Sequence, residues 1–126
     1  MSPNTDSNKN NNKLIARLTI AKNLLEENFS EKVDINTIAK EAALSKFHFS
    51  RSFKSVFGVS PHQFVLNKRL ERSAELIIEG KLMITDIASQ VGFADIYSFS
   101  KSFKKRFNTC PSGFYTKASF IYNLGE

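Results

Sequence analysis

The segment 87–114 reads IASQVGFADIYSFSKSFKKRFNTCPSGF, and its order of residue types repeats that of segment 38–64, IAKEAALSKFHFSRSFKSVFGVSPHQF. Corresponding residues lie 49 positions apart in the first half of the copies and 50 positions apart in the second half. The second copy has one additional residue between its two halves. The shared residues are Ile38, Ala39, Leu44, Phe53, Phe57, Pro61 and Phe64 in the first copy, and Ile87, Ala88, Phe93, Phe103, Phe107, Pro111 and Phe114 in the second. A period of this length indicates a repeated supersecondary unit.

Each copy carries the signals of a short helix, a tight turn and a longer helix. Asp34 is a predicted N-cap of the first short helix, Ser45 caps the longer one, and Gly58 ends it. The run 60–63 is a capping box with proline at the first helical position, and it starts a helix that Gly80 stops. Leucine and alanine at helical spacing predict one more helix before the repeat. The predicted helices are 13–28, a short helix after Asp34, 46–57, 61–79, 84–91, 95–107 and 111–117.

This order of elements is the helix-turn-helix layout, in which the second helix of each pair lies in the major groove of DNA. The sequence therefore predicts an all-α fold of about seven helices, with two helix-turn-helix subdomains joined by a long central helix. We expect a disordered tail over 1–12, a DNA-binding domain over 13–117 and a C-terminal tail over 118–126. Within the domain, the first subdomain covers 13–60, the linker helix 61–80 and the second subdomain 81–117.

The positive charge is concentrated in two stretches without acidic residues. The net charge is +6, yet residues 42–70 and residues 96–125 hold five bases each and no acid. These bases are Lys46, Arg51, Lys54, Lys68 and Arg69 in the first stretch, and Lys101, Lys104, Lys105, Arg106 and Lys117 in the second. A solvated helix normally mixes the two signs, as the helix 61–79 does. Two acid-free stretches, one in each copy, therefore indicate a polyanionic partner.

The composition excludes several classes of protein. One cysteine allows no disulfide within the chain, no run of about 18 apolar residues could span a membrane, and the polar N-terminus lacks a signal-peptide core. His48, His62 and Cys110 match no zinc spacing. The chain has neither paired carboxylates, nor a nucleophile–base set, nor a glycine-rich phosphate loop. We therefore predict a cytoplasmic protein that is not an enzyme and that needs no metal, cofactor or membrane.

The run from Ile87 to Phe93, the run from Phe99 to Phe107, and Pro111 with Phe114 together resemble the motif of the AraC/XylS family of transcription regulators. The resemblance covers about residues 13–117. In size the chain is similar to the compact members without an effector domain, of the MarA and SoxS kind. The resemblance implies a nucleoid-associated bacterial activator that contacts RNA polymerase. It also implies that a monomer binds two successive major-groove segments on one face of double-stranded promoter DNA.

The second copy departs from the first at two helix starts. Met83 stands where Asp34 caps the first copy, and its side chain accepts no backbone N–H, so Thr85 is an alternative cap one turn later. Cys110 stands in the place of Ser60. Both changes predict looser helix starts in the second subdomain, each at a cost of about 1 kcal/mol.

The helix 46–57 divides into two faces. Its predicted core residues are Phe49, Phe53, Val56 and Phe57, and the opposite face holds Phe47, Ser50, Arg51 and Lys54, with Lys46 at the N-terminal end. Arg51 can grip guanine with two hydrogen bonds, Ser50 can bond a base edge, and Phe47 can lie on a thymine methyl. Lys46 and Lys54 are predicted phosphate contacts. For Phe47, a satellite core contact with the first helix is the alternative interpretation.

The helix 95–107 divides in the same way. Phe99, Phe103 and Phe107 are predicted core residues, and the predicted base-reading residues are Ile96, Tyr97, Ser100 and Lys101. Ile96 and Tyr97 stand where the family often has polar readers, so we expect fewer hydrogen bonds to bases from this helix. Lys104, Lys105 and Arg106 are predicted phosphate contacts, and cations there also suit the C-terminal end of a helix dipole.

Two alternatives to a compact regulator stay open at this point. The chain could be the DNA-binding end of a longer regulator with a sensor domain, with the Asn-rich residues 1–12 as a linker. It could also be a helical module that binds an acidic protein, and such a module would not rank DNA duplexes by their sequence.

Overall fold

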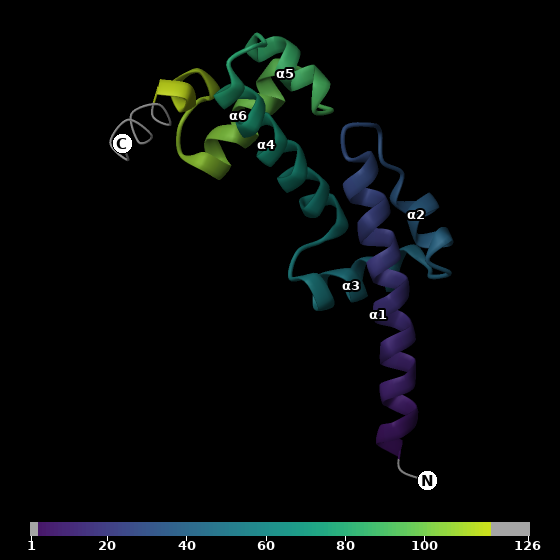
Figure 1. Cartoon of the computed structure of the whole chain (residues 1–126). Helices are drawn as coiled ribbons and strands as arrows, with labels where there is room; N and C mark the ends of the chain where they lie inside the picture. The colour runs from purple at the N-terminus through teal and green to yellow at the C-terminus, as the bar shows by residue number, and fades with distance from the viewer. Residues whose placement is uncertain (1–2, 117–126) are drawn as a thin grey trace. The chain divides into compact units, whose positions relative to one another are not determined.

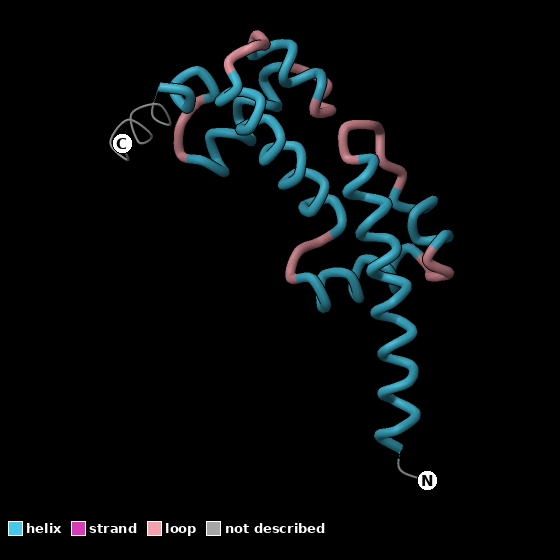
Figure 2. Tube along the Cα trace, in the orientation of Figure 1, coloured by secondary structure: helices cyan, strands magenta, loops and turns pink. Residues whose placement is uncertain are grey.

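The structure, a computed structural model, describes the backbone of residues 3–116 and the side chains of residues 11–116 (Figure 1). The helices in this part of the chain are α1 (Pro3–Asn28), α2 (Ile35–Glu41), α3 (Lys46–Phe57), α4 (Pro61–Glu79), α5 (Ile84–Gln90) and α6 (Ile96–Phe107). Residues 111–116 form a further helical segment. No strand occurs within residues 3–116, as Figure 2 shows, and the predicted all-α class is confirmed.

Helix α1 begins much earlier than the sequence predicted. It starts at Pro3, ten residues before the expected start at Lys13, so the predicted disordered tail is wrong for residues 3–12. Proline suits the first position of a helix, and the interior of α1 contains no further proline and no glycine. Once the packed part of a helix has formed, each added residue costs only the small propagation term, so polar residues can extend it. The predicted C-terminal tail, 118–126, lies outside the described residues.

The described chain divides into two compact units. The first consists of residues 3–28 and 33–65, and the second of residues 29–32 and 66–116. The pair α2–α3 lies in the first unit and the pair α5–α6 in the second, as the repeat predicted. The division falls inside α4, so this helix supplies its first five residues to the first unit and the others to the second.

A phenylalanine ring stands at the centre of each unit. Phe53 in the first unit and Phe103 in the second are completely buried. Each is surrounded by three further phenylalanine rings, with ring centroids 4.6–5.6 Å away. These neighbours are Phe49, Phe57 and Phe64 around Phe53, and Phe99, Phe107 and Phe114 around Phe103. All four positions correspond between the copies, so the repeat in the chain is also a repeat in the packing.

Aliphatic side chains complete each core. In the first unit, α1 packs against α2 and α3. The buried side chains there include Leu18, Ala21, Leu25, Ile35, Ala39, Ala42 and Val65. In the second unit, the buried cluster around the phenylalanines contains Leu70, Leu76, Ile77, Ile87, Ala88 and Val91. The burial of these side chains is the main stabilising contribution, since apolar burial yields about 25 cal/mol per Å².

The tight turns of the two helix-turn-helix pairs share one hydrogen-bond pattern. Each turn contains a residue with positive φ, Ala43 at 58° in the first and Gly92 at 107° in the second. The next amide donates to the carbonyl five residues earlier, at 2.9 Å in the first turn and 3.0 Å in the second. This is the Schellman pattern of a helix end. The longer helices also end alike, with Gly58 at φ 83° and Asn108 at φ 61°.

Side-chain caps fix most helix starts. Asp34, Ser45, Ser60 and Asp95 accept backbone N–H groups at 2.7–3.1 Å. The sequence placed Asp95 inside its helix, whereas the structure makes it the N-cap and moves the helix start to Ile96. Helix α5 follows Met83 without a side-chain cap, as the exchange at that position predicted. The alternative cap is wrong, because Thr85 lies inside α5.

Candidate nucleic-acid interface

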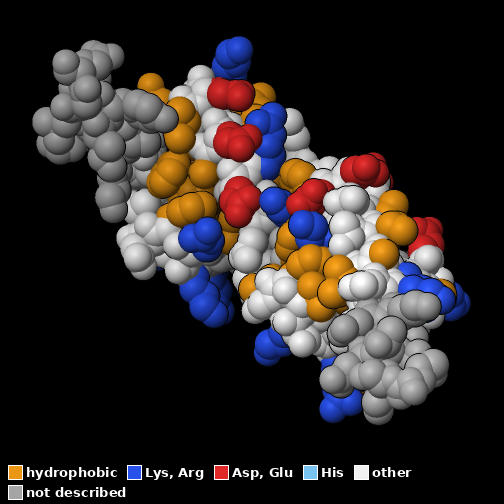
Figure 3. Space-filling view, turned by 60° about the horizontal axis from the view of Figure 1, so that its bottom comes forward, with side chains coloured by type: hydrophobic (Ala, Val, Ile, Leu, Met, Phe, Trp, Pro, Cys, Tyr) orange, Lys and Arg blue, Asp and Glu red, His pale blue; other side chains and the backbone are white. Residues whose placement is uncertain are grey.

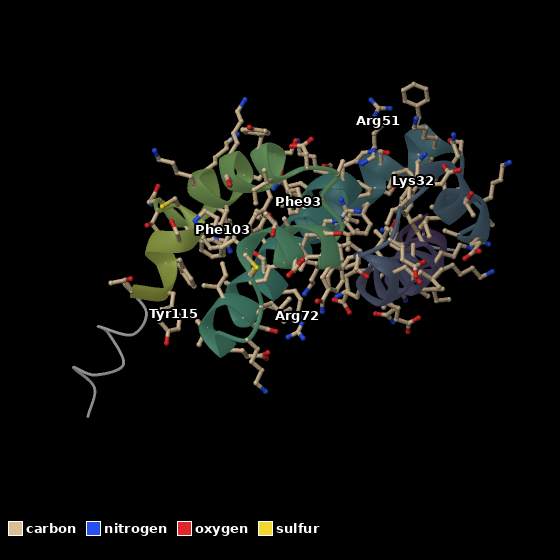
Figure 4. The ribbon with its side chains drawn as sticks, turned by 90° about the horizontal axis from the view of Figure 1, so that it is seen from above. Lys32, Arg51, Arg72, Phe93, Phe103 and Tyr115 are labelled. Atoms are coloured by element: carbon tan, nitrogen blue, oxygen red, sulfur yellow. The ribbon has the colours of Figure 1, made fainter. Side chains whose placement is uncertain are left out.

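Helix α3 presents an aromatic and cationic face to solvent. Lys46, Phe47, Arg51 and Lys54 are exposed, and Ser50 is half-buried. Figure 4 shows the Arg51 side chain pointing away from α3. Phe47 is 83% exposed, so the alternative that it is a satellite of the core is wrong. These five residues are called the α3 face below.

Helix α6 presents a corresponding face. Tyr97 is 83% exposed, like its counterpart in α3, and Lys101 and Lys104 are also exposed. Ser100 is half-buried, as Ser50 is. The corresponding pairs are Phe47 with Tyr97, Ser50 with Ser100, Arg51 with Lys101, and Lys54 with Lys104. The two helices therefore offer side chains of the same kinds, an aromatic ring, a serine and two cations, in the same order. Tyr97, Ser100, Lys101 and Lys104 are called the α6 face.

Two residues of these helices lie differently from their predicted places. Ile96 was expected to face outward, but it is half-buried and packs against the core cluster of the second unit. As the first residue of α6 it lies beside the turn, where apolar atoms of the core can cover it. Val56 was expected in the core, but it is 40% exposed. Phe49, Phe53 and Phe57 already fill the inward stripe of α3, so Val56 is left on its flank.

The C-terminal end of α6 is more cationic than that of α3. Lys104, Lys105 and Arg106 occupy its last turn and are all exposed. The corresponding positions of α3 hold Lys54, Ser55 and Val56. The guanidinium of Arg106 lies 5.2 Å from the centroid of the Phe107 ring, a cation–π contact that leaves its N–H groups accessible. Helix α6 therefore offers more positive charge at its C-terminal end than α3 does.

Two bases of the first acid-free stretch are engaged within the fold. The guanidinium of Arg69 donates from Nε to the carbonyl of Phe29 at 2.6 Å and from Nη2 to the carbonyl of Glu31 at 2.9 Å. Burial lowers the pKa of Arg69 from its ordinary value. Lys68 lies 3.7 Å from a carboxylate oxygen of Glu71. The cations of this stretch that face solvent from α3 are thus Lys46, Arg51 and Lys54.

The cap residues carry the resolved carboxylate pKa shifts. Asp34 accepts from the hydroxyl of Thr37 at 3.2 Å and from the amide of Asn36 at 2.9 Å, and these bonds lower its pKa from the ordinary value of 3.8. Asp95 accepts from the amide of Ser98 at 2.7 Å and from its hydroxyl at 3.3 Å, which lowers its pKa likewise. Both carboxylates act in helix capping, Asp34 at the start of α2 and Asp95 at the start of α6.

The remaining candidate groups form no site in the described residues. His48, His62 and Cys110 are exposed, and no three His, Cys, Asp or Glu side chains in the described part of the chain could hold a metal ion together. The thiol of Cys110 lies 3.3 Å from the hydroxyl of Ser112, and this hydrogen bond is the main cause of its lowered pKa. Among the described helices none is long and apolar enough to cross a membrane.

Comparison with known proteins agrees with this geometry. The family described as "Helix-turn-helix domain" matches residues 38–117. The probable transcription factor PqrA of Proteus vulgaris is 38% identical over 85 residues, which are 68% of this chain and 70% of that protein. The probable transcriptional regulator LumQ of Photobacterium leiognathi is 30% identical over 95 residues, which are 75% of this chain but only 38% of that protein. The chain thus spans well under half the length of that relative.

A solved structure extends the likeness to three dimensions. The crystal structure of a transcriptional regulator from Chromobacterium violaceum, described as containing an AraC-type DNA-binding domain, aligns with a TM-score of 0.74 and 28% identity. The alignment covers 81% of this chain and 91% of that one. The family match includes both helix-turn-helix pairs, from Ile38 in α2 to the segment that follows α6. This chain therefore belongs to the AraC-type helix-turn-helix domain family.

Proposed function

We propose that this protein binds double-stranded DNA by sequence and regulates transcription, as an activator at promoters. The observation that supports this most is the matched pair of exposed faces on α3 and α6. Each face offers an aromatic ring, a serine hydroxyl and two cations in one order, and the α3 face adds a third cation, Lys46, before them. Each face follows a helix-turn-helix turn. In that geometry the second helix of the pair enters the major groove. The names of relatives such as PqrA, a probable transcription factor, agree with this function.

The α3 face carries the stronger base readout in this proposal. Arg51 donates two hydrogen bonds to guanine O6 and N7, Ser50 forms a hydrogen bond with a base edge, and Phe47 packs on a thymine methyl group. Each good bidentate pair contributes about 1–3 kcal/mol of discrimination. In the α6 face, Lys101 stands in the place of Arg51. Its ammonium group is a point charge and lacks the two parallel N–H donors of a guanidinium. Helix α6 therefore discriminates less between bases, through Tyr97, Ser100 and the exposed part of Ile96.

Phosphate contacts come from the other cations of the two helices. These are Lys46 and Lys54 in α3, and Lys104, Lys105 and Arg106 in α6. Such contacts hold the protein in register on the duplex without reading sequence, and each releases counterions when it forms. Because three of the five lie in the last turn of α6, the second unit supplies most of the sequence-independent affinity.

The proposal includes a binding mode and partners. One copy of the chain engages two successive major-groove segments, one with each unit, and bacterial RNA polymerase is the partner in activation. The protein then works in the cytoplasm, in association with the nucleoid, and needs no metal or cofactor. Each unit already contains a complete helix-turn-helix pair, which is what other regulators obtain by dimerising.

Selection from random DNA duplexes tests the function directly. We expect one enriched site, bound by one copy of the chain, and we expect unlabelled duplexes to compete in an order set by their sequence. A protein module for an acidic partner would be displaced equally by all duplexes of one length, and that result would refute the proposal. Sedimentation of the complex measures the number of copies, and a stable dimer on one site would contradict the monomer.

Spacer insertions in the selected site test the two-segment mode. Helix α4 has 19 residues, or about 28 Å at 1.5 Å per residue, and residues of both units belong to it. Successive major-groove segments lie about 34 Å apart. We expect an insertion of about five or about ten base pairs between the half-sites to reduce binding to that of one unit alone. Recovery at ten would indicate a flexible tether, and indifference to both insertions would mean that only one unit reads sequence.

A further inference from the structure

A lysine of α1 lies over the last aromatic ring of α3. The ammonium Nζ of Lys22 is 5.2 Å from the centroid of the Phe57 ring. Exposed Lys and Arg side chains project into solvent, as Figure 3 shows for one side of the molecule, whereas Lys22 is half-buried. A cation at this distance is attracted to the face of the ring, and an ammonium has three N–H donors, so the contact leaves donors for a further partner. Lys22 is therefore a charged group that the first unit holds in one place.

The second unit has the same arrangement, but its cation comes from a different element. Phe107 corresponds to Phe57 in the repeat, and Cζ of Arg106 also lies 5.2 Å from the centroid of its ring. Arg106 belongs to α6 itself, whereas α3 has Val56 at the corresponding position. Each unit thus holds one cation over the ring that ends α3 or α6. Because Arg106 is a proposed phosphate contact, its counterpart in the first unit is a candidate for the same role.

The end of α3 lies where phosphates border the groove in the proposed binding mode. Helix α3 has 12 residues, or about 18 Å at 1.5 Å per residue, whereas the major groove is about 12 Å wide. The N-terminal residues of such a helix contact base edges, so its C-terminal end meets the backbone. Phe57 follows Lys54, a proposed phosphate contact, by three residues, and residues at this spacing are neighbours on a helix surface. A cation over the Phe57 ring therefore lies near Lys54, within reach of an adjacent phosphate.

We propose that Lys22 is a further phosphate contact of the first unit, supplied by α1 and held in place by the Phe57 ring. This inference rests on the proposed function, since it places Lys22 against the same DNA. Helices α3 and α6 alone supply two and three phosphate contacts, so Lys22 makes the numbers equal in the two units. Because its side chain is already held in the free protein, the contact loses less side-chain entropy than one from an exposed lysine. Sequence-independent affinity is then shared more evenly than α3 and α6 alone would give.

The salt dependence of DNA binding tests this role. Lys22→Met removes the charge but keeps an apolar stem over the ring. We expect it to reduce the slope of the logarithm of the binding constant against the logarithm of the salt concentration by about one. Its loss of affinity relative to the unaltered protein should then shrink about 3.5-fold between about 50 and about 200 mM salt, because one counterion fewer is released. Lys22→Arg keeps the cation and should keep the slope.

A second lysine of α1 provides the matched control. Lys13 is exposed and lies nine residues before Lys22, about two and a half turns, so it is on the opposite side of the helix. Lys13→Met changes the net charge equally and should leave the slope unchanged. A slope that falls equally in both methionine variants would overturn the proposal. So would a Lys22→Met variant that loses free energy of unfolding in urea but keeps the slope, because Lys22 would then act only in the fold.

Neutral phosphates in the selected DNA site locate the contact. Replacing phosphates by methylphosphonate, one at a time, should reveal one position that weakens binding of the unaltered protein but not of Lys22→Met. We expect this position to be adjacent to the one identified in the same way with Lys54→Met, and Arg106→Met to identify a position in the other half-site. If no position distinguishes Lys22→Met, or if the one that does lies in the α6 half-site, the proposal is wrong.

The salt titrations also separate this proposal from the proposed function. If the unaltered protein bound all duplexes alike, reading by sequence would be refuted, and the slopes of Lys22→Met and Lys13→Met on that DNA would still decide the role of Lys22. If the unaltered protein bound no duplex at all, both proposals would be refuted.

Discussion

The guanidinium of Arg69 occupies the space where a side chain on residue 92 would begin. A Cβ on Gly92 would lie 2.9 Å from Nε of Arg69 and 2.8 Å from the carbonyl oxygen of Ser30. The same guanidinium donates to the carbonyls of Phe29 and Glu31. Helix α4, the segment 29–32 and the turn between α5 and α6 therefore meet at one point in the second unit, and glycine is what lets them approach.

Alanine at position 92 should be much more damaging than alanine at another glycine with positive φ. Gly58→Ala is the matched control, since Gly58 has φ 83° but open space around its Cβ position. We expect that variant to lose about 1–2 kcal/mol from backbone strain alone. Gly92→Ala adds overpacking of about 1–3 kcal/mol to the strain, so we expect a total of about 3 kcal/mol. Urea unfolding of both variants measures the difference, and equal losses would contradict the close approach.

Arg69→Lys should destabilise the second unit without a direct effect on DNA contacts. A lysine cannot reach both carbonyls as the guanidinium does, and one hydrogen bond from a charged group contributes about 1.5–3 kcal/mol. Arg51→Lys is the control, because Arg51 is exposed and its replacement should leave the free energy of unfolding unchanged. The test is urea unfolding together with DNA titration at a temperature where all variants are folded. A loss of affinity in folded Arg69→Lys without a loss of stability would place this residue at the DNA.

Phe47→Ala and Tyr97→Ala should leave stability within about 0.5 kcal/mol, since both side chains are 83% exposed. Both variants should bind the selected site more weakly than the unaltered protein does. Replacing the contacted thymine by uracil removes only the methyl group. We expect this replacement to weaken binding of the unaltered protein to that half-site, but not binding of the alanine variant. A uracil penalty that persists in Phe47→Ala would assign the methyl contact to another residue.

Arg51→Ala and Lys105→Ala should separate base reading from phosphate contact. Arg51→Ala should cost about 1–3 kcal/mol on the best site and relax specificity at one or two base pairs. Lys105→Ala should weaken binding to all DNA sequences about equally. It should also reduce the slope of the logarithm of the binding constant against the logarithm of the salt concentration by about one. Titrations of specific and random duplexes at several salt concentrations provide both quantities. The assigned roles are wrong if Arg51→Ala lowers specific and random binding by the same factor.

The cap carboxylates should make stability depend on acid pH. The pKa values of Asp34 and Asp95 lie below 3.8 in the folded chain, so their charged forms stabilise it. This contribution is fully present above the unfolded pKa and is lost as the pH falls through the lower folded values. Asp34→Asn and Asp95→Asn keep a capping oxygen without a charge, so their unfolding free energy should fall less between pH 5 and about pH 2. Glu27→Gln, which removes an exposed charge from α1, is the control and should follow the unaltered protein.

The parts of the fold that could be predicted rest on local signals. Phe53 and Phe103 were placed in the core by their spacing, and Ser45 and Ser60 were identified as caps, because period and capping involve neighbours in sequence. Two predictions failed for different reasons: the Asp95 cap is a local contact with the amide of Ser98 that the prediction missed, and the place of Val56 depends on tertiary packing. Asp95 caps α6 although it looks like its first residue, and Val56 shares the spacing of the core stripe but lies on its flank.

Residue spacing along the chain is enough to predict two copies of a helix-turn-helix pair and most of the side chains that face solvent from α3 and α6. Which cations are available depends on contacts between residues that are far apart in the chain. Arg69 belongs to the acid-free stretch, yet its partners are backbone carbonyls 40 and 38 residues away. A carbonyl has the same chemistry in every residue, so nothing in the sequence could mark it as a partner. The same holds for Gly92, where the need for glycine comes from the atoms of Ser30 and Arg69 and not from the turn alone, because the first turn accepts Ala43 at the corresponding position.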